Sequence, residues 1–155
     1  MSYSLRIENG DLLIGSNRSL EVVTGKQKLF QDLTMWILER VGTDPATPLY
    51  GSTLDGGVID GQEIPSFIGQ IPTQYNLNLI KAEVLDLLHK YQQMQIAKMR
   101  QELIEFDGKH TLSGDEVLHT INSVEIGVVD TLVLVRVKCI TLNKNSLNIT
   151  IPLAA

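Results

Sequence analysis

Hydrophobic residues recur along the chain with two different periods, which separate a helical first part from a strand-rich last part. Between residues 29 and 41 they fall at intervals of one, three and four, the spacing of one helix face: Leu29, Phe30, Leu33, Trp36, Ile37 and Val41. We expect this face to be buried. Thr24 and Gln27 have the spacing of a capping box, and Gly42 can close a helix in the left-handed conformation. The pattern therefore predicts a helix within residues 24–42 that begins near Gly25.

A second, longer helix is predicted over residues 76–107. Its apolar positions repeat at three and four: Leu77, Ile80, Val84, Leu87, Tyr91 and Met94, and then Met99, Leu103 and Phe106. Asn76 is available as the N-terminal cap and Gly108 as the stop. Methionine and glutamine are frequent in the second half, which suits packing against neighbouring chains, although packing in the protein's own core explains the same residues.

The period becomes two in the last third of the chain. Val133, Val135, Val137 and Cys139 share one face of a strand, and Arg136 and Lys138 share the other. Strands are predicted over 121–129, 132–142 and 147–151, with turns between them and one or two helical turns at 113–120. The result is an antiparallel three-stranded sheet over residues 120–152. Because helices precede the strands, the fold class is α+β.

The remaining segments are an extended lead-in and a long connection. Asn9-Gly10 predicts a hairpin, or an extended arm, within residues 1–23. Residues 43–75 are rich in glycine and proline, and we interpret residues 53–72 as an insertion that is flexible or ordered by a partner. Residues 63–70 could supply one brief helix.

Composition limits the class of protein. A chain of 155 residues with 43% hydrophobic and 20% charged residues is expected to form a single folded domain. The net charge of -5 argues against a nucleic-acid-binding protein. No apolar run is long enough to span a bilayer, and the N-terminus has no signal-peptide core. We therefore expect the protein to be made in a cytoplasm and not to associate with a membrane.

No pattern of catalytic or ligand-binding residues stands out. Glu102, Glu105 and Asp107 are better explained as an exposed acidic helix face than as a general acid and base. The histidines (His89, His110 and His119) have neither the spacing nor the cysteine partners of a zinc site. Cys139 lies in an apolar strand, which favours a packed thiol over a nucleophile. We expect no enzyme activity, no metal and no cofactor.

The first predicted helix carries a more specific pattern. Gly25, Leu29, Gln31, Leu33, Ile37 and Leu38, followed by Gly42 and by Pro48-Leu49-Tyr50-Gly51-Ser52, resemble the baseplate wedge family of contractile phage tails. That family includes the sheath-initiating proteins of type VI secretion and of phage-tail-like bacteriocins. The resemblance covers residues 20–54, about a quarter of the chain.

The resemblance implies a structural protein of the virion tail baseplate that is assembled in the host cytoplasm in several copies per particle. Its partners would be other baseplate wedge subunits and the tail sheath protein, with tube or hub proteins as further candidates. The family-motif positions expected to bind partners are Gly25, Leu29, Gln31, Leu33, Ile37, Gly42, Pro48, Tyr50 and Gly51. The last strand would template the first ring of sheath by strand addition through Leu147, Asn148, Ile149, Thr150 and Ile151.

The chain departs from the family at one motif, and two other functions stay open. Members commonly carry a Glu-Pro-Arg triplet ahead of the C-terminal sheet, whereas residues 105–124 contain neither proline nor arginine. The alternatives are a cell-wall glycan hydrolase, because the family has carried a lysozyme label, and a cytoplasmic adaptor of the same fold. On the strand-addition hypothesis, truncation after Asn143 should leave a folded protein that no longer nucleates sheath.

Overall fold

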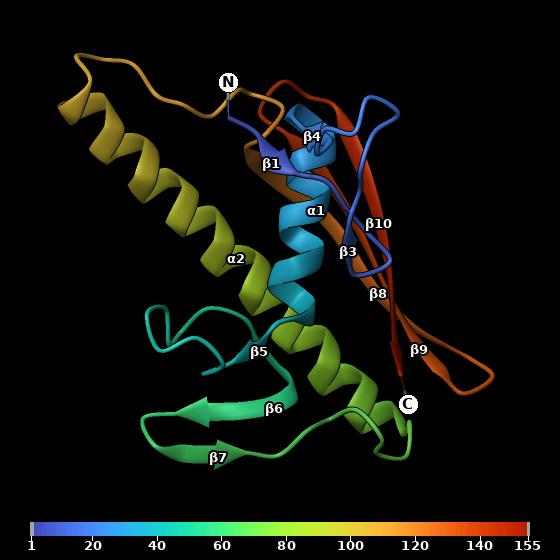
Figure 1. Cartoon of the computed structure of the whole chain (residues 1–155). Helices are drawn as coiled ribbons and strands as arrows, with labels where there is room; N and C mark the ends of the chain where they lie inside the picture. The colour runs from blue at the N-terminus through green and yellow to red at the C-terminus, as the bar shows by residue number, and fades with distance from the viewer. Residues whose placement is uncertain (1, 155) are drawn as a thin grey trace.

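The computed structural model describes residues 2–154 and places two helices on one face of an antiparallel sheet (Figure 1). Helix α1 (Gly25–Leu38) packs against strand β10 (Ser146–Ala154) of this sheet, and helix α2 (Gln74–Glu105) packs mainly on β8 (Leu118–Val129). Strand β9 (Leu132–Thr141) lies between these two strands. The α+β class and the C-terminal three-stranded meander predicted from the sequence are confirmed.

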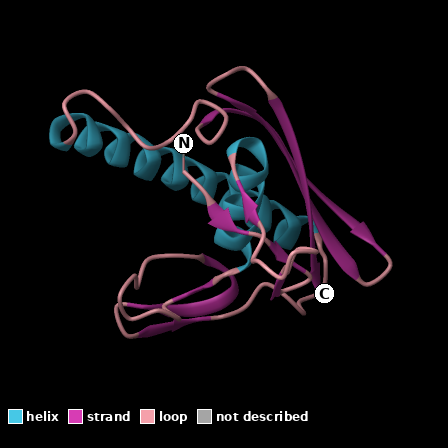
Figure 2. Ribbon diagram, turned by 45° about the horizontal axis from the view of Figure 1, so that its top comes forward, coloured by secondary structure: helices cyan, strands magenta, loops and turns pink. Residues whose placement is uncertain are grey.

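The N-terminal segment forms two small pairs of strands. Strands β2 (Ile7–Glu8) and β3 (Asp11–Leu12) make the hairpin predicted from Asn9-Gly10, with positive φ at both turn residues. Strand β1 (Ser4–Leu5) pairs instead with β4 (Val22–Val23), which leads directly into α1. Figure 2 shows these short strands beside the helices and the long sheet.

Helix α1 begins where the sequence predicts but is capped differently. The Thr24 side chain makes no cap hydrogen bond; the Gly25 N–H donates to Glu116 Oε1 at 3.2 Å. The helix ends at Leu38 rather than at Gly42, because the chain then enters β5 (Arg40–Val41). The predicted face is buried except for Phe30, which is 40% exposed, so that position was assigned wrongly.

The glycine-rich connection is folded against the helices, which corrects its interpretation as an insertion that is flexible or ordered by a partner. Strand β6 (Ser52–Ile59) pairs in parallel with β5 and antiparallel with β7 (Gln62–Ile64). The Ser52 hydroxyl donates to the Ile37 carbonyl at 2.7 Å, which joins the start of β6 to the end of α1. The brief helix predicted over residues 63–70 is absent from this described segment, where β7 and turns occur instead.

Helix α2 starts two residues before its predicted position and ends close to the expected stop. Thr73, not Asn76, is the cap: its side chain accepts a hydrogen bond from the Asn76 N–H. Gly108 donates to the Leu103 carbonyl with φ of 84°, as a closing glycine should. The buried residues of the helix are Ile80, Val84, Leu87, Leu88, Tyr91, Gln95 and Glu102. Met94 is exposed, so the predicted seam is wrong at that position.

The C-terminal sheet follows the predicted alternation. Val135, Val137 and Cys139 are buried beneath the helices, and Ile149 and Ile151 of β10 complete this layer. Strand β8 begins at Leu118, so the predicted helical turns at 113–120 are reduced to one turn before it. Strand β10 continues through Pro152 instead of ending before it.

Candidate docking site

Strand β10 forms an edge of the sheet, and the phase of its hydrogen bonds determines which residues face outward. The order β10-β9-β8 leaves β10 with one strand neighbour among the described residues. The Leu147 carbonyl lies toward β9, where the Cys139 thiol donates to it at 3.7 Å. At the turn, the Thr141 N–H donates to the Asn145 carbonyl at 2.9 Å, in the same phase.

This phase assigns the outward positions to alternate residues of β10. In an antiparallel pair, the N–H and C=O of one residue point to the same side, and successive residues alternate. Ser146, Asn148, Thr150 and Pro152 therefore direct their backbone groups away from β9. The Ser146 carbonyl confirms this, because it accepts a hydrogen bond at 3.3 Å from Lys26 Nζ of α1. Pro152 agrees with this assignment, because a proline at an outward position costs no hydrogen bond to β9.

The part of the outward edge that is available for hydrogen bonding is thus short, and it is limited at both ends. Lys26 occupies the Ser146 carbonyl at one end, and Pro152 lacks a donor at the other. Asn148 and Thr150 lie between them with their outward N–H and C=O groups directed away from the sheet. Such an edge can take one additional strand and make main-chain hydrogen bonds with it.

A groove of about 710 Å³ lies beside this edge. Its walls are the β2–β3 hairpin, the open side of α1, and two residues of β10, Leu147 and Pro152. On α1, Phe30, Thr34 and Leu38 follow one another at intervals of four and form an open stripe next to the buried stripe of Leu29, Leu33 and Ile37. Sequence reasoning placed Phe30 in the core and did not single out Lys26; the four-residue spacing of the second stripe was the available signal for Phe30.

The family-motif residues are mostly internal in this fold. Leu29, Leu33 and Ile37 are almost fully buried among α2 and the sheet. Their role in partner binding stays a prediction, and the structure shows these side chains in the protein's own core. Gly25 is the first residue of α1, with φ of 57°.

The other motif positions shape the protein's own chain. The Gln31 side chain accepts from the Ile7 N–H and donates to the Leu5 carbonyl, which holds the N-terminal strands against α1. Tyr50 packs edge-to-face on Trp36 with ring centroids 4.4 Å apart. Gly42 and Gly51 have positive φ, and a Cβ on either would overlap a backbone oxygen of Val58 or Glu39. Pro48 is exposed in the loop between β5 and β6.

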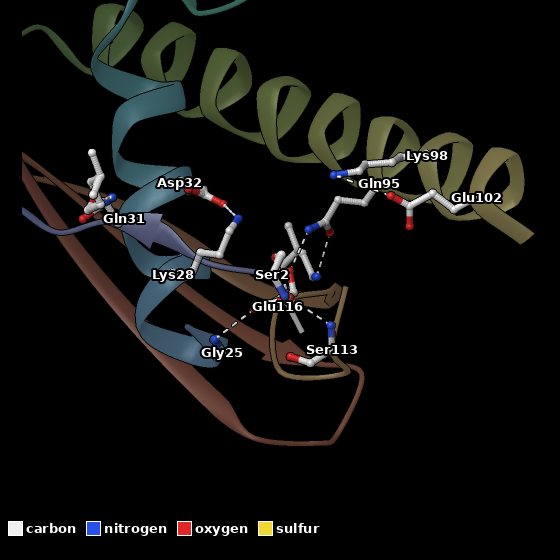
Figure 3. Close-up of polar contacts among 12 residues, drawn as sticks. Ser2, Gly25, Lys28, Gln31, Asp32, Gln95, Lys98, Glu102, Ser113 and Glu116 are labelled. Carbon is white, nitrogen blue, oxygen red and sulfur yellow. Dashed lines mark hydrogen bonds and ion pairs between the residues drawn. The ribbon is translucent and has the colours of Figure 1, made fainter. Parts of the chain in front are cut away.

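The buried carboxylate at the centre of Figure 3 belongs to Glu116. It is 1% exposed and accepts hydrogen bonds from the Ser2 N–H and hydroxyl and from the Gly25 and Ser113 N–H groups. Burial raises the pKa of Glu116, but these hydrogen bonds together outweigh burial and hold the pKa below its ordinary value. The group therefore acts as an ionised anchor that joins its own turn at Ser113 to two distant segments, at Ser2 and Gly25.

Two polar side chains of α2, Gln95 and Glu102, attach the helix to the segment before β8; both are drawn in Figure 3. Gln95 accepts from the Leu118 N–H and donates to the Glu116 carbonyl at 2.7 Å. Glu102 accepts two hydrogen bonds from Thr111, and these lower the pKa of its carboxyl group. Each carboxylate is thus held by backbone and hydroxyl donors of its own chain, and neither has the raised pKa of a general acid.

The other candidate groups are dispersed. The three histidine rings contact Gln92, Leu112 and Thr120 on separate segments. Burial raises the pKa of the Cys139 thiol to about 11, which disfavours the thiolate. Within residues 2–154 no group of three or more His, Cys, Asp or Glu side chains could hold a metal ion, and no helix is both long and apolar enough to cross a membrane.

A second cavity, of about 580 Å³, lies between α1, α2 and the N-terminal strands. Its polar lining includes the ion pair of Lys28 and Asp32, together with Gln95. Tyr91 also lines it, and burial, followed by the nearby Asp32 charge, raises the pKa of the Tyr91 phenol. Of the other lining residues, Lys98 pairs with Glu102 at 3.8 Å, and Gln95 bonds the backbone of Glu116 and Leu118.

The chain was compared with protein-family models, with curated proteins and with solved structures, and nothing in any of the three comparisons matches it. The geometry of the edge and groove is therefore the basis for a functional proposal, with the sequence resemblance beside it.

Proposed function

We propose that this protein is a structural assembly subunit that accepts an extended strand of another protein along β10. The observation that carries the proposal is the outward edge at Asn148 and Thr150, open beside an apolar groove. An edge of this kind would promote aggregation in a protein with no partner for it. Its short length and its closed ends at Lys26 and Pro152 suit the docking of one defined segment.

The resemblance of residues 20–54 to the wedge family supports a particular setting for this activity. In that setting the protein is a component of the inner baseplate wedge of a contractile tail, and the docked strand belongs to the sheath. Helix α2 supports the companion role of joining wedge subunits. Its C-terminal half extends beyond the sheet (Figure 1) and carries a partly exposed row with heptad spacing: Ile96, Met99, Leu103 and Phe106.

The proposal is tested by blocking the edge without disturbing the fold. Proline at Asn148, or separately at Thr150, removes an outward N–H but no hydrogen bond to β9, as Pro152 already does. In the organism that makes the particle, either variant should fold and enter baseplates, and the tails should lack sheath. Asn148→Thr, which keeps the N–H, is the matched control and should give sheathed tails.

Two measurements decide the outcome. Electron microscopy of purified particles counts sheathed and bare tubes, and antibody labelling locates the protein at the tail base. Absence of the protein from the particles would contradict the baseplate setting. Normal sheath assembly with both proline variants would contradict docking at β10.

A further inference from the structure

The two sides of an added strand would meet very different surroundings at β10. Residues of the added strand opposite Ile149 and Ile151 would point to the helix side of the sheet, because side chains alternate between faces. That side holds the groove lined by Phe30, Leu38 and Leu147. Apolar side chains are therefore favoured at these positions.

Residues opposite Asn148 and Thr150 would point to the outer face of the sheet. In the register of the sheet, Asn148 lies beside Lys138 and Thr150 lies beside Arg136. An added side chain would be two strands from these cations, about 10 Å between backbones. Long basic side chains can reach a carboxylate across that distance.

The charges that face this position leave a positive excess. Glu125 of β8 lies opposite Arg136 and contacts Lys138 at 3.9 Å, so one carboxylate faces two cations. Asp115 lies near the start of β10, beside Gly25 of α1, and accepts a hydrogen bond from the Asn145 side-chain amide. Two further carboxylates lie on the helix side of the sheet: Glu8 lines the groove, and Asp55 shares a smaller pocket with Pro152. The positive excess is therefore confined to the outer face, at Arg136 and Lys138.

We propose that the docked segment alternates apolar and acidic residues, with the apolar side chains in the groove and the acidic ones facing Arg136 and Lys138. This inference rests on the proposed strand docking and specifies the chemistry of the partner. A second copy of the chain fits the site poorly, because its own β10 would present Asn148 and Thr150 to the two cations.

The probe is a synthetic, fluorescently labelled peptide of alternating valine and glutamate, titrated onto the full chain. Nitrogen-edited NMR should show the largest shifts at the Asn148 and Thr150 amides. Binding should weaken at high salt, because the charges are exposed to solvent. A peptide of alternating valine and lysine, and a scrambled valine and glutamate peptide, are the matched controls and should bind at least tenfold more weakly.

Variants separate the two parts of the recognition. Arg136→Gln with Lys138→Gln should weaken binding of the glutamate peptide about five- to tenfold, and Phe30→Ser should weaken binding of both charged peptides alike. Arg100→Gln, on an exposed part of α2, is the control and should change nothing. Asn148→Pro should abolish binding altogether.

The outcomes distinguish this inference from the strand-docking proposal. Equal affinity for the lysine and glutamate peptides, with loss of both in Asn148→Pro, would overturn the acidic preference and leave strand docking intact. Failure of every peptide to bind, or a dimer of the free protein that Asn148→Pro dissociates, would overturn the inference outright.

Discussion

At the scale of single residues, Glu116 shows how a polar side chain can hold distant parts of the chain together. Its carboxylate bonds Ser2 and Gly25, which lie 114 and 91 residues before it in the sequence, and also the nearby turn at Ser113. The sequence predicts one or two helical turns over residues 113–120, and Ser113 and Glu116 have the three-residue spacing of a capping pair. The local bond to the Ser113 N–H is present, but the bonds to Ser2 and Gly25 depend on the tertiary fold and could not be predicted from spacing.

Replacing Glu116 by glutamine is expected to destabilise the protein by about 2 kcal/mol at neutral pH, the typical value of hydrogen bonds to a charged group. Its pKa is lowered in the folded state, so its contribution is complete above the unfolded carboxyl pKa of about 4.3 and is lost as pH falls through the lower folded value. The difference between Glu116→Gln and the wild type should therefore shrink in acid.

Urea unfolding at neutral pH and at about pH 3 measures this difference. Glu63→Gln, at an exposed position in β7, is the control and should unfold like the wild type at both values. A gap that grows as the pH falls would show that the carboxylate does not contribute in its ionised form.

At the scale of elements, prediction succeeded where burial follows a local period. Strands β9 and β10 alternate between buried and more exposed residues, and the turns of the sheet lie at Asp130 and Lys144, both with positive φ. Strand β6 was missed because its glycines interrupt the alternation. Gly57 is needed there for packing, since a Cβ would lie 2.3 Å from the Val41 side chain. The contact that explains the residue is thus non-local, and the sequence shows only a turn-like Asp-Gly-Gly.

The junction between β5 and β6 gives a test of this close packing. Gly42 and Gly61 have nearly the same φ, 79° and 76°, but a Cβ on Gly42 would lie 2.4 Å from the Val58 carbonyl oxygen whereas Gly61 faces open space. Gly61→Ala should cost about 1 kcal/mol from backbone strain alone. Gly42→Ala should cost about 3 kcal/mol or more, because the overlap adds to the strain.

Thermal and urea unfolding of the two variants measure these costs. Equal destabilisation by both substitutions would mean that the β5–β6 junction relaxes around the added methyl group. The double variant gives a further check: because the two glycines lie in separate turns, its loss of unfolding free energy should equal the sum of the two single losses.

At the scale of the whole molecule, the candidate site combines three segments that are far apart in sequence. The edge comes from β10, one wall from α1 and the other from the β2–β3 hairpin. The sequence indicated the edge strand through its alternation, but nothing local places the hairpin or Phe30 beside it. The buried stripe of α1 was predicted because it has to face the core, whereas its open stripe becomes significant only once the sheet edge is placed.

The same arrangement changes the expected result of removing β10. The sequence suggests that truncation after Asn143 leaves a folded protein, but Leu147, Ile149, Ile151 and Leu153 are all buried in the common core. At about 1.5–3 kcal/mol per buried side chain, their loss amounts to roughly 6–12 kcal/mol. That is comparable with the whole stability of a domain, about 5–15 kcal/mol. The truncated chain should therefore lose cooperative unfolding and its near-ultraviolet dichroism from Trp36, and it should bind an apolar dye. Asn148→Pro should behave like the wild type in all three measurements: it should unfold cooperatively, keep the dichroism and bind no dye. A truncated chain that unfolds cooperatively near the wild-type midpoint would contradict this assignment of the core. Loss of docking by the truncation alone would carry no information about the edge, because the same deletion removes the β10 side chains that belong to the common core.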